Sequence, residues 1–93
     1  MIYWPTKAPA AIIDYGADWG PALSRLGAGI TITASAWNRV SGDAVAGANS
    51  FTGTTTMVRI SGGTDGTSSV FENVVTLSNG QVLDKKALVK VRL

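Results

Sequence analysis

The sequence predicts an all-β fold, a single antiparallel Ig-like β-sandwich with one short helical turn. Runs rich in β-branched and aromatic residues recur between clusters of turn residues about every ten residues, which is typical of β-sandwiches. Asn79-Gly80 separates two of these runs, and both residues accept the positive φ angles of a type I′ hairpin turn. The chain contains no cysteine, so the disulfide pattern of true immunoglobulin domains is missing.

The chain is expected to have two parts, an extended N-terminal arm over residues 1–10 and a β-sandwich domain over residues 11–93. Pro5 and Pro9 have no backbone N–H and bias the residues before them toward extended conformations. We therefore expect the arm to lie across another surface and not to form a central strand. Tyr3 and Trp4 are expected either to dock on the domain's own body or to be buried in a partner. Its removal is expected to leave the fold intact.

Alternation of apolar and polar residues places the first strand at residues 11–19. The helical turn follows at residues 21–26, with Pro21 at the favoured first position and Gly27 at its end. The next strand, residues 29–37, alternates between an apolar face and a Thr/Ser face that ends in Trp37. A tryptophan on a polar face indicates either an edge contact or part of an interface.

Further strands are expected at residues 44–48, 56–61, 70–78 and 83–93, and the last three of these form an antiparallel meander. Asn73 lies on an otherwise apolar strand face. Because buried polar groups are normally paired, we expect a buried amide that bonds backbone groups at a turn or bulge. The residues expected in the core are Tyr15, Trp19, Phe71, Val75 and Val89.

Composition limits the functions open to this chain, whose 93 residues correspond to one domain. Charged residues make up 15%, below the roughly one quarter of typical proteins, which indicates that much of the surface faces protein. The net charge is only +2, and the alternating Lys86, Lys90 and Arg92 predict a solvated strand face and not a nucleic-acid site. No apolar run approaches the roughly 18–20 residues that span a bilayer, so we expect no membrane partner.

Side chains suited to catalysis are scarce, because the chain has neither histidine nor cysteine. Asp14 and Asp18 are about 13 Å apart along one strand, too far for carboxylate pairs that work at roughly 5–9.5 Å. Asp18 is instead placed to cap the following turn. Residues 62–67 lack the lysine of a phosphate loop and the spaced acidic ligands of a calcium loop, and form a hairpin loop. We therefore expect no enzyme activity, no cofactor and no metal.

Binding to other proteins is expected through loops and the arm, because loops on a rigid sandwich usually carry recognition residues. The two tips of the C-terminal meander, residues 62–67 and 79–82, are the candidate loops. Aromatic residues of the arm are the anchors that interface hot spots favour. The residues expected to contact partners are Tyr3, Trp4, Trp37, Thr64, Asp65 and Gln81.

Several segments of the chain follow one another in a recognisable order. A strand similar to LDY-xx-DW, residues 13–19, precedes a "gdtIttStW"-like strand, residues 29–37. A threonine-rich strand that leads into SGGTxGT follows at residues 54–67, and a final N-x-V-T segment extends over residues 73–91. This order resembles the phage fibre-tail adaptor proteins, small virion proteins of tailed bacteriophages. Residues 81–86 differ from the family pattern, which has an acidic and arginine-containing stretch there.

The resemblance implies a non-enzymatic structural protein of the virion, a multi-copy adaptor that joins the tail to fibre or baseplate components. It implies assembly in the bacterial host cytoplasm, and partners among the other tail, fibre, baseplate or neck proteins in a symmetric assembly. Two alternatives remain open. One is a capsid decoration or cement protein, and the other is a carbohydrate-binding module in which Trp4, Trp19 and Trp37 form an exposed stacking platform.

Overall fold

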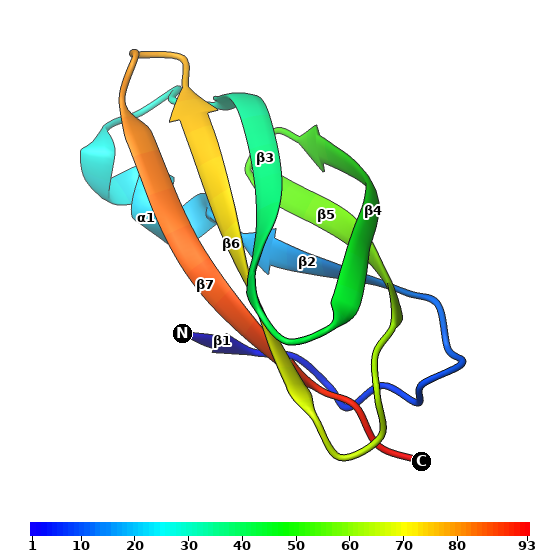
Figure 1. Ribbon diagram of the computed structural model, residues 1–93. Coiled ribbons are helices and arrows are strands. Elements are labelled where there is room, and N and C mark those ends of the chain that lie inside the picture. Colours follow the sequence, from blue (N-terminus) through cyan, green and yellow to red (C-terminus); the bar gives the residue numbers. More distant parts are fainter.

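Two β-sheets pack face to face in the computed structural model, which describes residues 1–93, and a short helix lies at one end (Figure 1). One sheet has four strands in the order β1-β7-β6-β3, and the other has three in the order β2-β5-β4. All neighbouring strands are antiparallel except β1 and β7, which are parallel. The elements are β1 Ile2–Tyr3, β2 Ile13–Asp18, α1 Gly20–Leu26, β3 Ile32–Ser41, β4 Ala44–Thr52, β5 Thr55–Gly62, β6 Ser68–Leu77 and β7 Val82–Lys90.

The predicted all-β sandwich with one short helix is confirmed, and its core lies between the two sheets. A cluster of 15 buried apolar residues fills this space. Every second residue of β6 is buried, as the pleat of a strand with one face on a core requires. The residues that the sequence assigned to the core are all buried: Tyr15, Trp19, Phe71, Val75 and Val89.

Asn73, a buried amide on β6, is at the centre of a hydrogen-bond network that joins the two sheets. Its Oδ1 accepts hydrogen bonds from Trp19 Nε1 at 2.9 Å and from Thr56 Oγ1 at 2.7 Å. Its Nδ2 donates to Ser35 Oγ at 2.9 Å and to the Ala36 carbonyl at 3.0 Å. The full hydrogen-bonding capacity of the amide is used. The expected buried and paired amide is confirmed, but three of its four partners are side chains and not backbone groups.

The N-terminal segment, which the sequence set apart as an extended arm over residues 1–10, packs on the domain itself. β1 pairs with β7, and Trp4 lies in the core with 9% of its surface exposed. The Trp4 ring stacks on Tyr15 with ring centroids 4.7 Å apart, and its Nε1 donates to the Gly16 carbonyl at 3.0 Å. Tyr15 Oη donates to the Pro5 carbonyl at 2.7 Å. Prolines favour extended backbone, and an extended segment can join a sheet edge as readily as it can leave the domain.

Lys7 is fully buried, which is rare for a lysine. Its ammonium donates to the carbonyls of Ala8 at 2.7 Å, Pro9 at 3.2 Å and Ala11 at 2.8 Å. These acceptors match the three donors of the ammonium and offset the cost of removing its charge from water. The Lys7 N–H also donates to the Lys90 carbonyl at 2.9 Å. Lys7 therefore fastens both the N-terminal segment and the turn that leads into β2.

Trp37 faces the core, although the sequence placed it on the polar face of its strand. The pairing of β3 with β6 shifts in register between Ile32 and Ala34, where Thr33 is an extra residue. One extra residue reverses the alternation that follows it, so Ile32 and Trp37 both point inward. The expected edge or interface position of Trp37 was wrong because a β-bulge separates it from the start of the strand.

Replacement of Asn73 by alanine should lower the free energy of unfolding by about 3–4 kcal/mol, because the Trp19 and Thr56 donors lose their buried acceptor. Urea unfolding of the purified protein measures the change. Asn38→Ala is the matched control, since Asn38 is exposed on β3 and makes no side-chain hydrogen bond; it should stay within about 0.5 kcal/mol of the parent protein. Equal losses in the two variants would contradict the structural role of the network.

Replacement of Trp4 by alanine should cost about 3–5 kcal/mol, as truncation of a large core side chain does. Tyr3→Ala, its neighbour in sequence, should be nearly neutral because 74% of the Tyr3 surface is exposed. Deletion of residues 1–8 removes Trp4 and Lys7 together and should unfold the domain. Thermal unfolding followed by circular dichroism tests all three variants, and a cooperative transition at the parent temperature in the deletion variant would restore the free-arm interpretation.

Candidate protein-interaction surfaces

The aspartates of β2 have separate structural partners and do not form a catalytic pair. Asp14 Oδ1 accepts a hydrogen bond from Arg59 Nε at 2.9 Å, in an exposed ion pair between residues that face each other on β2 and β5. The hydrogen bond from Arg59 holds the pKa of the Asp14 carboxyl below its ordinary value of 3.8. Asp18 accepts a hydrogen bond from the Gly20 N–H at 2.9 Å, so its carboxylate takes one backbone N–H before α1, but the N-cap residue is Trp19 and the helix has no side-chain cap.

No group of three metal-ligating side chains comes together in the chain. The helix α1 is not long and apolar enough to cross a membrane. The surfaces that stand out are the two ends of the sandwich, the uncovered face of the four-stranded sheet and the strand edges.

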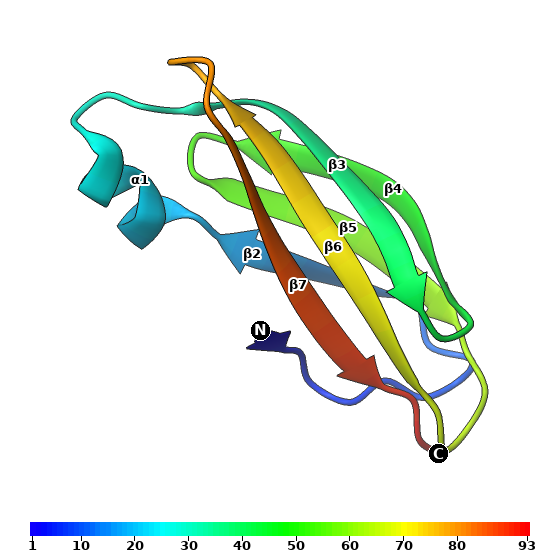
Figure 2. The same cartoon turned by 60° about the vertical axis from the view of Figure 1, so that its left-hand side comes forward.

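The two loops expected to bind partners lie at opposite ends of an elongated molecule. Its principal extents are 43, 21 and 17 Å. The β5–β6 loop, residues 62–67, lies beside the C-terminus, whereas the β6–β7 turn lies at the other end, near α1 (Figures 1 and 2). The structure therefore does not bring Thr64 and Asp65 together with Gln81. A partner that contacts one end leaves the other end free for a second partner.

Asp43 organises the end that carries the β5–β6 loop. From the β3–β4 turn, its carboxylate accepts hydrogen bonds from the Thr64 N–H at 3.2 Å, from the Thr64 hydroxyl, and from the Thr67 hydroxyl at 3.3 Å. The Thr64 bonds contribute most to holding the pKa of the Asp43 carboxyl below its ordinary value of 3.8. Asp65 Oδ1 accepts a hydrogen bond from the Leu93 N–H at 2.9 Å. Thr64 and Asp65 are thus exposed on a loop that is held at two points.

The opposite tip is a hairpin turn of a different type from the one that the sequence predicted. Only Gly80 has a positive φ, at 88°, and Asn79 does not, so the turn is not type I′. The Gly80 N–H donates to the Leu77 carbonyl at 2.9 Å, and Asn79 Oδ1 accepts from the Gln81 N–H at 3.1 Å. Asn79 favours the turn through its side chain and not through its backbone angles. Gln81 is exposed on this closed turn.

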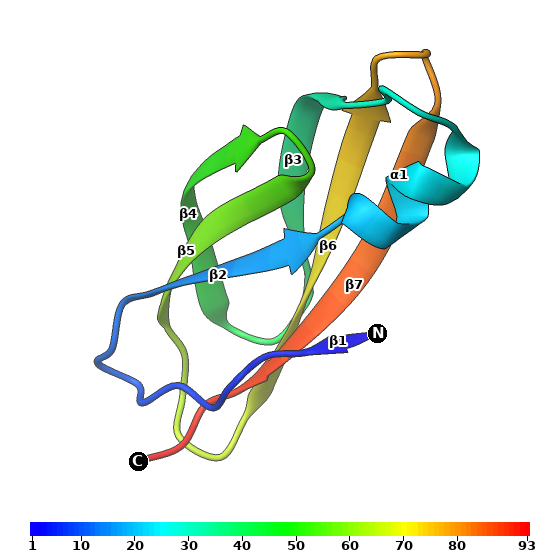
Figure 3. The same ribbon diagram turned by 180° about the vertical axis from the view of Figure 1, so that it is seen from behind.

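Tyr3 lies on the outer face of the four-stranded sheet. In the strand register Tyr3 is beside Leu88, and Leu88 is beside Val70, so the three side chains form an apolar row across β1, β7 and β6. Leu88 and Val70 are half-buried, and no other element of the chain covers this face, which is toward the viewer in Figure 1, whereas Figure 3 shows the opposite side with the three-stranded sheet in front. Of the aromatic residues expected to contact partners, Tyr3 alone presents its ring to solvent.

The three tryptophans do not form an exposed platform. Trp4, Trp19 and Trp37 are all buried, and the Trp4 and Trp37 ring centroids are 5.5 Å apart within the core. Trp4 and Trp37 therefore cannot act as aromatic anchors for a partner without unfolding of the core. The stacking surface that a carbohydrate-binding module needs is missing from this part of the molecule.

Sequence reasoning missed the interactions of Asp43, Lys7 and Lys85. The Lys85 ammonium lies 4.7 Å from the centroid of the Trp19 ring and donates to the Asp18 carbonyl at 3.4 Å. Asp43 and Lys85 form hydrogen bonds with segments that are distant in the sequence. Lys7 donates to nearby backbone carbonyls, which no sequence motif identifies as acceptors. The one available signal for Lys85 was its odd position in β7, which turns its side chain opposite to those of the exposed Lys86, Lys90 and Arg92.

Comparison with known proteins identifies a family. The family model described as "Podophage GP4 fiber-tail adaptor protein gp77" matches residues 7–90. This match covers nearly all of the sandwich and confirms the resemblance derived from the order of the sequence segments. No curated protein matches the chain.

The stability of the protein should fall as the pH drops below about 4. The Asp14 and Asp43 carboxyls have pKa values below 3.8 in the folded protein. Their contribution to the free energy of unfolding is therefore complete at pH values above the pKa of the same carboxyls in the unfolded chain. It is lost as the pH falls through the lower, folded pKa values. Melting temperatures of the parent and of Asp43→Asn should differ at pH 7 and should converge as the pH falls through the lowered folded pKa of Asp43. Asp84→Asn, whose carboxylate makes no hydrogen bond, is the control, and a constant difference for Asp43→Asn at every pH would contradict the assignment.

Proposed function

The chain belongs to the podophage fibre-tail adaptor family, and on this premise we propose that it is a non-enzymatic, multi-copy virion protein. It joins tail components to fibre or baseplate components by protein–protein contacts. It is made in the cytoplasm of the bacterial host and is incorporated into the tail or its attachments. The family match over residues 7–90 is the observation that carries this proposal.

The shape of the molecule supports a role in joining two neighbours. A body of 43 × 21 × 17 Å presents separate surfaces at its two ends. At one end Thr64 is held in place by the hydrogen bonds that it donates to Asp43, and at the other end a closed hairpin turn presents Gln81. Loops that are already ordered lose little conformational entropy when they bind, which favours a stable joint. We assign Thr64, Asp65 and Gln81 to contacts with neighbouring virion proteins.

The outer face of the four-stranded sheet supplies a third contact surface. Tyr3, Leu88 and Val70 form an apolar row on this face, and Tyr3 is mostly exposed. An exposed tyrosine beside half-buried aliphatic residues is a common composition for the centre of an interface. Trp4 and Trp37, which the sequence had grouped with Tyr3, support the core beneath this surface.

Localisation in fractionated phage particles tests the proposed function. Quantitative mass spectrometry of separated capsids and tails should find the protein in the tail fraction at a fixed multiple of the other tail proteins. Recovery with the capsids at a ratio that matches the capsid lattice would support a decoration protein instead. Absence from both fractions would exclude a virion role.

Tyr3→Ala should reduce incorporation into tails about tenfold, as the loss of an aromatic anchor does, while the protein remains folded. Met57→Ala is the matched control, because Met57 is also an exposed, large apolar residue but lies on the other sheet, on β5. The amount of each variant in purified tails, relative to the parent protein, measures the effect. Normal incorporation of Tyr3→Ala would remove this face from the interface.

A further inference from the structure

The first and the last strand of the chain lie side by side and run in the same direction. β1 pairs with β7 at Ile2 and Tyr3, and this is the one parallel pairing among the strands of the sandwich. The N-terminal segment then follows the last part of β7 toward the C-terminus (Figures 1 and 3). Residues 2–7 and 87–92 together are called the terminal clamp here.

Backbone hydrogen bonds continue the clamp beyond β1. The Trp4 N–H donates to the Leu88 carbonyl, and the Lys7 N–H donates to the Lys90 carbonyl, both at 2.9 Å. In return, the Arg92 N–H donates to the Lys7 carbonyl at 2.9 Å. A parallel bridge at Lys7 belongs to the same pairing. The clamp therefore joins the two terminal segments over several residues and with donors on both sides.

Side chains fasten the N-terminal half of the clamp to the other sheet. The Trp4 ring is buried in the core and stacks on Tyr15, and its Nε1 donates to the Gly16 carbonyl. The Tyr15 hydroxyl donates to the Pro5 carbonyl. The N-terminal segment cannot slide along β7 without withdrawing an indole ring from the core and breaking these two bonds.

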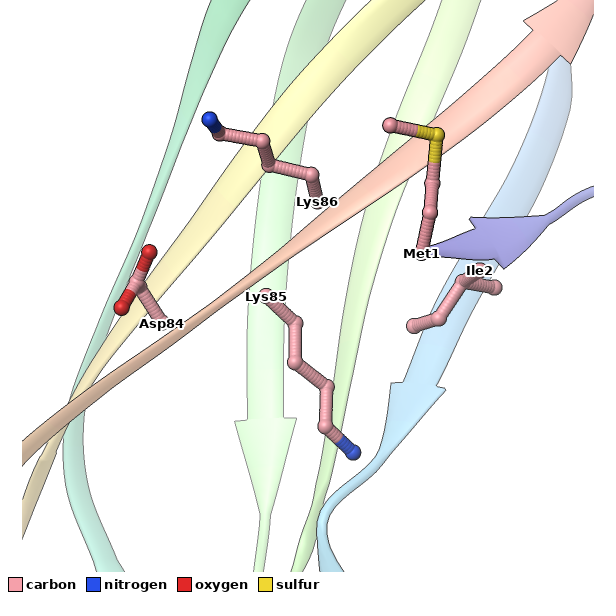
Figure 4. Close-up of a pocket in the computed structure, with 5 residues that line it drawn as sticks. All are labelled: Met1, Ile2, Asp84, Lys85 and Lys86. Carbon is pink, nitrogen blue, oxygen red and sulfur yellow. The ribbon is translucent and has the colours of Figure 1, made fainter.

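The clamp begins almost at the start of the chain. Its register starts at Ile2, beside a hollow of about 590 Å³ (Figure 4). The residues that line this hollow are Met1, Ile2, Asp84, Lys85 and Lys86. A pull on Met1 therefore acts on the first pair of the clamp directly, with no other paired structure to peel away before it.

Tension between the two terminal segments loads the clamp in shear. Because the two strands are parallel, a pull at residue 1 draws residues 2–7 backward, while a pull at residue 93 draws β7 forward. The strands are forced in opposite directions along their length, so the evenly spaced bonds of the parallel pairing are strained together and not one after another. β7 is paired with β6 over its whole length on the other side, so the sliding occurs at the clamp.

We propose that the terminal clamp makes this domain a load-bearing unit, which resists tension applied between its N-terminal and C-terminal segments. The clamp bonds are the shortest connection between these segments, so the rest of the sandwich carries little load until they break. Removal of the N-terminal segment opens the core between β7 and β2, so rupture of the clamp unfolds the domain. The inference goes beyond the proposed function and does not rest on it, because it concerns the isolated domain.

Single-molecule pulling of the purified protein in two directions tests the proposal. Handles at residues 1 and 93 load the clamp in shear. Handles at Ser68→Cys and residue 93 pull β6 and β7 apart at the open end of their hairpin, because Ser68 lies opposite Lys90. The chain has no cysteine, so the introduced thiol is a unique attachment point. At one pulling speed, the end-to-end unfolding force should be several-fold higher than the force that separates the hairpin. Equal forces, or a lower end-to-end force, would overturn the proposal.

A matched pair of variants at Arg92 tests the backbone bonds. Arg92→Pro removes the N–H that donates to the Lys7 carbonyl. Arg92→Ala keeps this N–H and controls for the side chain, which is exposed and makes no hydrogen bond. The end-to-end unfolding force should fall in Arg92→Pro and should remain at the parent value in Arg92→Ala. The same force in both variants would remove this bond from the clamp and contradict its role in bearing load.

Asn73→Ala separates resistance to force from equilibrium stability. Forced unfolding follows the rate of unfolding and not the free energy of unfolding. If the clamp breaks first, the network of Asn73 is still intact at the barrier, so its loss changes that rate little. Asn73→Ala should therefore be destabilised in urea and still unfold end to end at a force close to that of the parent protein. A larger loss of force in Asn73→Ala than in Arg92→Pro would place the barrier in the core and overturn the proposal.

The two pulling directions of the parent protein decide if either Asn73→Ala or Arg92→Pro fails to fold. All of these measurements use the isolated domain, so a negative result leaves the adaptor role intact. Absence of the protein from tails, conversely, would defeat the adaptor role and leave the terminal clamp standing.

Discussion

Asn73 is the point at which the two sheets and the start of the helix share hydrogen bonds, and the register of the sandwich depends on it. The amide belongs to β6, Thr56 to the opposite sheet, and Trp19 directly precedes α1. In a core of low dielectric, each of these polar groups is costly unless it is paired. A shift of one residue in either sheet would turn Asn73 or Thr56 outward and leave its partners unpaired. Apolar packing alone would not specify the register so narrowly.

The N-terminal segment closes the side of the sandwich that the strands themselves leave open. Trp4 covers the core between β7 and β2 and uses its N–H on the Gly16 carbonyl, at a strand edge that has no other neighbour. Lys7 then fixes the turn into β2 with its ammonium. This segment contributes both the side chain that covers the core and the backbone that pairs with β7, so stability is concentrated in a few residues at one end of the sequence.

Much of the fold could be predicted from the sequence because it is local. The alternation of β6 and β7 and the turn residues around Gly80 depend on neighbouring residues only. The inward turn of Trp37 could not be predicted, since the bulge at Thr33 involves an ordinary β-branched residue with no local signature. The burial of Trp4 was missed because its partners are distant in the chain. Of the expected contact residues, those on the loops and the outer face are exposed, namely Tyr3, Thr64, Asp65 and Gln81.

The N-terminal segment also determines which part of β7 is paired on both sides. Pairing of β1 and Lys7 with the C-terminal half of β7 fixes that half between two neighbours. The rest of the strand, toward Val82, is held by its pairing with β6. Its order therefore depends on the β6–β7 hairpin, whose turn is closed by the hydrogen bonds of Gly80 and Asn79.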